Sequence, residues 1–137
     1  MELVLDISNF WKPFLAVFGT WFVVQVLKAG LNYRANTPMS FLQNGGQISG
    51  HAATTVALAS TILLETGLSL LFLISLVLAA IVINDATGVR RETSKHSTFL
   101  NKLTQRKDYR IVGHDPIEVL TGVTFGIIIP LIIYALL

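Results

Sequence analysis

Val119–Leu137, the last nineteen residues, reads VLTGVTFGIIIPLIIYALL and contains no charged side chain. A helix needs about 20 apolar residues to cross the hydrocarbon core of a bilayer. Three earlier segments are nearly as apolar: Pro13–Leu27, Ala52–Leu64 and Leu68–Ile83. The sequence therefore predicts an all-α, polytopic bundle of about four membrane-spanning helices. The second of these reaches a spanning length only if it starts near Ser49.

The composition agrees with a single integral-membrane domain over residues 1–137. Hydrophobic residues make up 53% of the chain and charged residues 13%, whereas an average soluble domain carries about 25% charged residues. The alternative, a soluble bundle of long core helices, is disfavoured because the last two apolar runs have no polar face. Cysteine is absent and histidine occurs three times, so we expect no disulfide, no metal site and no cofactor. Acidic Glu2 and Asp6 argue against a cleaved signal peptide.

Two longer polar segments, Lys28–Gly50 and Asn84–Pro116, separate the apolar runs. With four crossings both lie on one side of the membrane, and the tight turn Glu65–Gly67 lies on the other side with the termini. Nine of the ten Lys and Arg residues fall on the side of the polar segments, and only Lys12 lies opposite. The positive-inside rule therefore predicts a multi-pass protein of the cell membrane with both polar segments in the cytoplasm.

The first candidate site lies where a polar segment enters the second apolar run, at Gly45–His51 (GGQISGH). Ser49 suits a helix N-cap, and glycines such as Gly50 allow close approach to the backbone. Free N–H groups at a helix start bind anions, and His51 beside them could donate a proton. The alternative is a flexible loop with a serine cap and an interfacial histidine, and the stretch taken alone favours this alternative.

The third apolar run ends in the charged stretch Asp85–Arg91 (DATGVRR). An acid at the mouth of a membrane helix needs a partner, which for Asp85 could be Arg90, Arg91 or Lys28. The planar fork of arginine suits phosphate oxygens. The alternative is a cluster that attracts anionic lipid headgroups without specificity.

The last helix begins at Gly113–Glu118 (GHDPIE). Asp115, Pro116 and Glu118 fit a capping box with proline at the first helical position, which would give Glu118 a structural role. Glu118 also lies one turn after His114 and could orient its imidazole, as a carboxylate orients a catalytic histidine. The predicted topology brings two histidines, a carboxylate, two helix starts and several arginines to one membrane face, and this conjunction is much less likely by chance than any one of its members.

Other polar and small residues are interpreted as structural. His96 and residues 102–110 are predicted to form a solvated or headgroup-facing loop. Gly122 and Gly126 form a small-xxx-small pair, which predicts close helix packing and suggests a homodimer.

The order of the motifs resembles the type 2 phosphatidic acid phosphatase superfamily, related to the acid phosphatase and vanadium haloperoxidase fold. It is most similar to the divergent branch of small membrane proteins. That branch carries a Gly-Gly…Ser-x-His stretch, an Asp-Ala-x-Gly-Val-Arg-Arg stretch and a Gly-His-x-Pro-x-Glu-Val stretch. The matching residues here are Gly45–His51, Asp85–Arg91 and Gly113–Val119, and the resemblance extends from Lys28 to about Gly126.

The resemblance implies metal-independent hydrolysis of a phosphomonoester or diphosphate, often on a lipid, through a phosphohistidine. It implies that His114 is the nucleophile, that Glu118 orients it and that His51 protonates the leaving oxygen. The implied phosphate-binding residues are Lys28, Ser49, Gly50, Arg90 and Arg91, supported by Asp85, Arg34 and Arg110. Arg91 lies 23 positions before His114 and Arg110 lies four before it, so the identity of the phosphate-binding arginine stays open.

The expected partners are the membrane and a lipid phosphate substrate, with no nucleic acid. An alternative function is a membrane protein that binds an anionic lipid headgroup or phosphate without turnover. A small transporter is disfavoured because no predicted span carries a charge at mid-depth.

Overall fold

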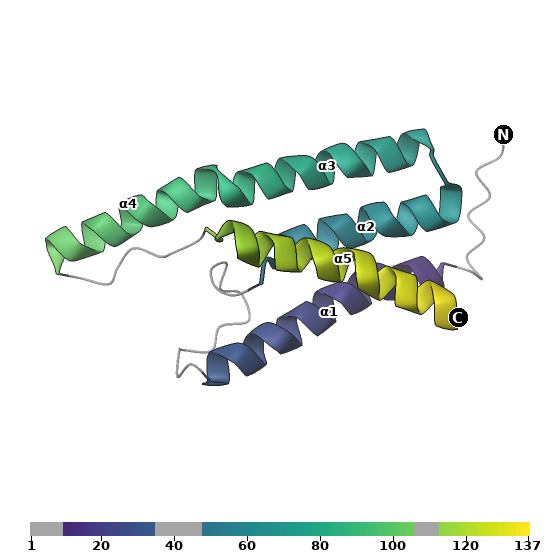
Figure 1. The fold of residues 1–137 in the computed structure, drawn as a ribbon, viewed down its shortest axis with the longest axis horizontal. Helices are drawn as coiled ribbons and strands as arrows, with labels where there is room; N and C mark the ends of the chain where they lie inside the picture. Colours follow the sequence, from purple (N-terminus) through teal and green to yellow (C-terminus); the bar gives the residue numbers. More distant parts are fainter. Residues whose placement is uncertain (1–9, 35–47, 106–112) are drawn as a thin grey trace.

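The computed structural model describes residues 10–34, 48–105 and 113–137. Within these ranges it contains helices and no strand (Figure 1), which confirms the all-α prediction. The helices in chain order are α1 (Trp11–Arg34), α2 (Gly50–Thr66), α3 (Leu70–Thr87), α4 (Val89–Thr104) and α5 (Pro116–Leu136).

Three segments of the described residues are long and apolar enough to cross a membrane: Trp11–Leu31, Leu70–Thr104 and Pro116–Leu136. Many of their large apolar side chains point outward, for example Phe22 (62% exposed) and Ile81 (61% exposed). A lipid-facing surface has this character, because lipid tails solvate such side chains. Helix α2 has 17 residues and does not meet the same length criterion, so three of the four predicted spans are confirmed by length and composition.

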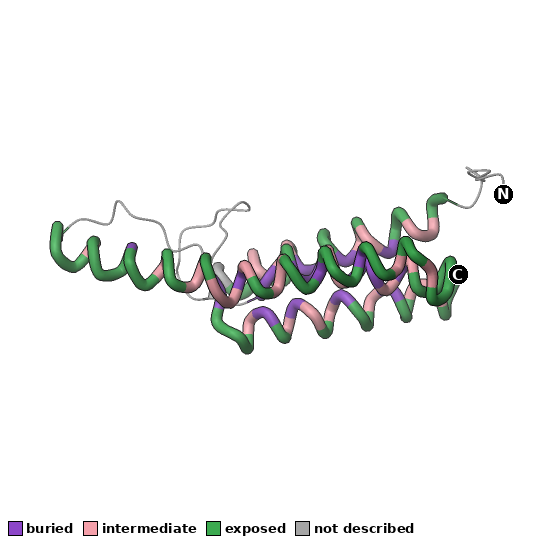
Figure 2. Tube along the Cα trace, turned by 90° about the horizontal axis from the view of Figure 1, so that it is seen from above, coloured by how far each residue is buried: buried purple, intermediate pink, exposed green. Residues whose placement is uncertain are grey.

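The core is built around α2, which packs against α1, α3 and α5. Its buried side chains are small: Ala52, Ala53, Ala57, Ala59 and Thr61. Figure 2 shows the buried positions gathered on the facing sides of the helices. Small side chains allow helix backbones to approach closely, which is how membrane helices gain packing energy.

The glycine pair of α5 meets this small surface of α2. A Cβ added at Gly122 would lie 2.4 Å from the carbonyl oxygen of Ser49, and one added at Gly126 would lie 2.6 Å from that of Ala53. The predicted close packing is therefore confirmed, and its partner is α2 of the same chain. The glycines are buried inside the bundle, so they no longer support the prediction of a homodimer.

His96 and Lys102, which were predicted to lie in a loop, lie in helix α4, so the prediction was wrong for this part of the segment. Helix α4 continues α3 beyond the bundle (Figure 1), and it contains His96 and Lys102. Val89, Leu100 and Leu103 share one side of α4 at helical spacing, and the basic residues occupy the other side. The helix is thus amphipathic, a pattern that a hydropathy average conceals. Residues 106–110 of the predicted loop lie outside the described residues.

Candidate functional site

The candidate site lies at the end of the bundle where α2 and α5 begin and α3 meets α4 (Figure 1). The segment before α5 is held against the α3–α4 junction by two hydrogen bonds. The amide of Gly113 donates to Ser94 Oγ (2.6 Å), and the amide of His114 donates to the carbonyl oxygen of Ala86 (3.5 Å). A Cβ at Gly113 would lie 2.4 Å from the carbonyl oxygen of Arg90, so only glycine allows this approach.

His114 is 3% exposed and contacts Glu118 one turn later. Its Nδ1 lies 3.1 Å from Glu118 Oε2, and the amide of Asp115 donates to the same oxygen at 3.1 Å. The side chain of Asp115 accepts from the Glu118 amide in return, which completes a capping box. One carboxylate oxygen of Glu118 therefore takes part in the capping box and also contacts the imidazole of His114.

The contact with Glu118 bears on the tautomer of the imidazole. A carboxylate accepts hydrogen bonds, so in a neutral ring this contact favours the tautomer with the proton on Nδ1 and the lone pair on Nε2. Burial lowers the pKa of His114 from its usual value, against the opposing hydrogen bond and charge of Glu118. A neutral ring with an available Nε2 is the form that can act as a nucleophile.

Residues distant in the sequence converge beside His114. The amide of Ser49 donates to the carbonyl oxygen of Glu118 (3.1 Å), which joins the start of α2 to the first turn of α5. His51, in the first turn of α2, is close enough to His114, Arg90 and Lys28 to interact electrostatically with each. Lys28 of α1 also interacts electrostatically with Glu118 and His114.

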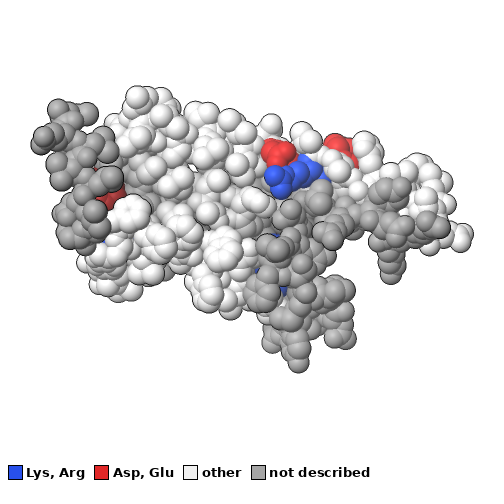
Figure 3. Space-filling model, turned by 180° about the vertical axis from the view of Figure 1, so that it is seen from behind, with Lys and Arg blue, Asp and Glu red and all other residues white. Residues whose placement is uncertain are grey.

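Acidic and basic side chains form ion pairs around the junction of α3 and α4. Of the three cations proposed as partners for Asp85, Arg90 makes the ion pair. Arg91 Nη2 lies 3.1 Å from Asp115 Oδ1. On the face shown in Figure 3, basic and acidic side chains stand side by side, and most of the remaining described surface is uncharged.

The remaining predicted site residues lie at the start of α2, at the end of α1 or outside the described residues. Ser49 is fully buried and caps α2, with its Oγ accepting from the Ala52 amide at 3.4 Å, and Gly50 is the first residue of α2. The Ser49 amide is used in its bond to the Glu118 carbonyl, so of these two residues Gly50 is the one whose backbone N–H could face a ligand. Arg34 ends α1, but its side chain and the whole of Arg110 lie outside the described residues. No cluster of three His, Asp or Glu residues suited to a metal ion occurs in the described part of the chain.

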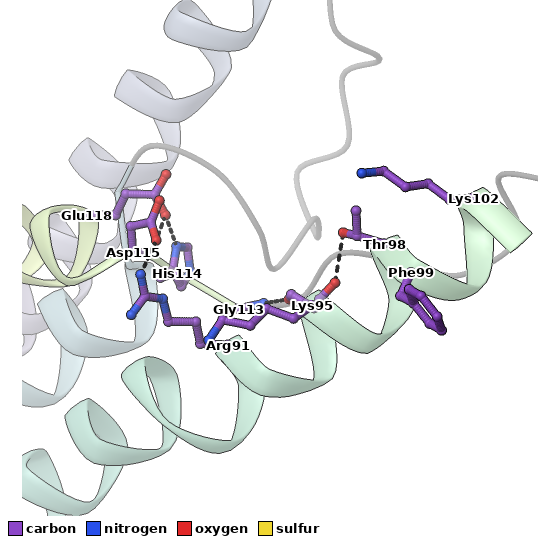
Figure 4. A pocket seen from close by; sticks show the side chains of 10 residues that line it. Arg91, Lys95, Thr98, Phe99, Lys102, Gly113, His114, Asp115 and Glu118 are labelled. Carbon is purple, nitrogen blue, oxygen red and sulfur yellow. Dashed lines mark hydrogen bonds and ion pairs between the residues drawn. The ribbon is translucent and has the colours of Figure 1, made fainter.

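A groove of about 520 Å³ lies between α4 and the start of α5 (Figure 4). It is lined by Arg91, Ser94, Lys95, Thr98, Phe99, Lys102, Gly113, His114, Asp115 and Glu118. The sequence interpretation missed its α4 wall because it treated that segment as a loop. The spacing of Arg91, Lys95, Thr98 and Lys102, at steps of four, three and four, could have revealed one helix face.

Comparison with known proteins identifies a family. The model of the divergent PAP2 family matches residues 9–129. The chain is also 32% identical to the uncharacterized membrane protein YuiD of Bacillus subtilis (strain 168), over an alignment of 158 positions that covers 97% of each chain. No solved structure matches the chain significantly.

Proposed function

The chain belongs to the divergent PAP2 family, and we propose that it is a membrane-embedded, metal-independent phosphatase acting through a phosphohistidine. The proposed substrate is a lipid phosphomonoester or diphosphate. The observation that carries this proposal is the buried His114 with its Nδ1 held by Glu118 and with His51 nearby. The apolar outer surface of α1, α3 and α5 supports a lipid substrate, because the lipid chain can stay in the bilayer.

The proposed first step transfers the phosphoryl group to the protein. The Nε2 lone pair of His114 attacks phosphorus, the bond from phosphorus to the lipid oxygen breaks, and His51 donates a proton to that oxygen. Phosphoryl transfer depends on positioning and charge neutralisation more than on covalent catalysis. Lys28, Arg90 and the backbone N–H groups at the start of α2 would supply the positive potential.

The second step restores the enzyme. Water attacks the phosphorus of the phosphohistidine, His51 takes a proton from that water, and the phosphorus–nitrogen bond breaks to release inorganic phosphate. His114 returns to its neutral form, with the hydrogen bond from Nδ1 to Glu118 still in place. From the distribution of the cations we expect this end of the bundle to face the cytoplasm.

The test is phosphate release by purified protein in detergent, with a chelator present and no added metal. The substrates are phosphatidate, phosphatidylglycerophosphate, polyprenyl phosphate and polyprenyl diphosphate. His114→Ala should lower the rate by roughly 10³-fold or more, and His51→Ala by about 10²- to 10⁴-fold. His96→Ala is the matched control, because His96 is an exposed residue of α4 that does not line the groove.

A trapping experiment separates the two histidines. With a substrate labelled on phosphorus, quenched wild-type protein should carry acid-labile label, and His114→Ala should carry none. Hydrolysis that persists in His114→Ala would refute the proposed nucleophile. Binding of these lipids without any hydrolysis would favour a non-catalytic protein that holds an anionic headgroup or phosphate.

A further inference from the structure

The groove beside His114 extends well beyond the residues that a single phosphoryl group could contact. Arg91 and Lys102 both line it, and they are eleven residues apart on α4, which corresponds to about 16 Å along a helix axis. Arg91 lies near His114 through its ion pair with Asp115. Lys102 therefore lies too far along α4 to share a phosphoryl group with Arg91.

The inner and outer parts of the groove differ in charge. At the inner end the carboxylates are engaged, Asp115 with Arg91 and Glu118 with His114. Further along α4, the lining residues Lys95 and Lys102 add positive charge without another lining acid. Lys95 also contacts Glu92, but such a solvent-exposed pair is worth little and can open to admit an anion.

The direction of the groove indicates which anion it could hold. Helix α4 continues the apolar α3 beyond the other helices (Figure 1), so the groove leads from His114 away from the packed bundle of α1, α2, α3 and α5. In Figure 4 the side chain of Lys102 extends from α4 toward the side on which His114 lies. A lipid substrate presents its terminal phosphate from the bilayer, and the groove therefore lies on the aqueous side of the reacting phosphorus.

We propose that the outer groove is a second phosphate site, which receives the inorganic phosphate released from His114 and guides it into water. The ligand class is a phosphate dianion, bound by the ammonium groups of Lys95 and Lys102, which both line the groove. Its role as an exit route rests on the proposed phosphatase function, whereas its affinity for phosphate does not. A lipid phosphate headgroup offers the same chemistry, so the test has to distinguish the two sources.

The experiment uses the full-length protein with both lysines replaced, Lys95→Gln and Lys102→Gln together. Binding of inorganic phosphate is measured by calorimetry in detergent at constant ionic strength, and phosphate is also titrated as an inhibitor of lipid hydrolysis. We expect both the dissociation constant and the inhibition constant to rise by about fivefold or more. Without added phosphate, kcat/KM should stay within about twofold of wild type, since neither lysine holds the reacting group.

The control is Lys12→Gln, which removes the same charge at the opposite end of the bundle, where Lys12 lies over the ring of Tyr134. It should leave phosphate binding unchanged. Calorimetry does not need turnover, so phosphate binding that depends on the two lysines supports the site even if no lipid is hydrolysed. Unchanged phosphate binding in the double variant would overturn the proposal. Weakened binding of phosphatidate in nanodiscs, with phosphate binding intact, would also overturn it and assign the groove to a headgroup.

Discussion

Gly113→Ala is expected to disable the site while the helices still form. The added Cβ would lie 2.4 Å from the carbonyl oxygen of Arg90, whereas ordinary contact begins at 3.4 Å. The Cβ position is fixed by the backbone of residue 113, and the carbonyl oxygen belongs to the backbone of Arg90, so no side-chain rotation can relieve the contact. The segment carrying His114 therefore has to move by about 1 Å. A displacement of about 1 Å can lower the rate of an enzyme by about 100-fold. The same movement would stretch the 2.6 Å hydrogen bond from Gly113 to Ser94 beyond normal length.

The assay is phosphate release from the best lipid substrate, with helicity and elution volume in detergent measured on the same samples. Gly30→Ala is the matched control, because it adds the same methyl group where nothing lies within 4 Å. We expect Gly30→Ala to match wild type and Gly113→Ala to lose about 100-fold in kcat/KM. A Gly113→Ala protein within about threefold of wild type would refute the argument that backbone contact positions the imidazole.

Three further predictions concern residues of α5. Glu118→Gln removes a charge that raises the pKa of His114, so the acidic limb of the pH profile of kcat/KM should move to lower pH. The plateau of the profile should also fall, because the imidazole is less well oriented. An acidic limb at unchanged pH would contradict the assignment of this limb to His114. Gly126→Leu should destabilise the protein by about 1–3 kcal/mol through overpacking, seen as earlier thermal unfolding in detergent. Tyr134→Phe removes the hydrogen bond to Glu65 and should cost about 1 kcal/mol of stability, with phosphate release unaffected.

The membrane-spanning helices could be predicted because the thickness of the bilayer sets a minimum length for an apolar run that crosses it. Helix α4 could not be found in this way, since its polar residues lower the average hydropathy and its helical character shows only in the spacing of its two faces. The pair Gly122 and Gly126 correctly indicated close packing. A small-residue pair, however, indicates only that another helix packs closely against it. It does not identify that helix, so the contact with α2 could be found only from the structure.

Candidate site residues could be proposed from the sequence because the helix starts and the charged stretches carry short, recognisable patterns. Their pairing could not be named, because Asp85 had three cations within plausible reach and only the fold selects Arg90. The two roles considered for Glu118 looked exclusive in the sequence. In the structure one oxygen contacts both the Asp115 amide and the His114 imidazole, so the two roles are compatible, and residue types do not reveal this geometry.

The shared oxygen of Glu118 links local melting to reactivity. If the first turn of α5 unwinds, the imidazole of His114 loses its anchor although the rest of the bundle is intact. Terminal helical turns open more readily than whole helices. On heating, phosphate release should therefore be lost at a temperature several degrees below that at which far-UV ellipticity declines. A change in lipid composition or membrane tension that strains this helix start would act in the same way. It would lower the rate of the proposed reaction reversibly.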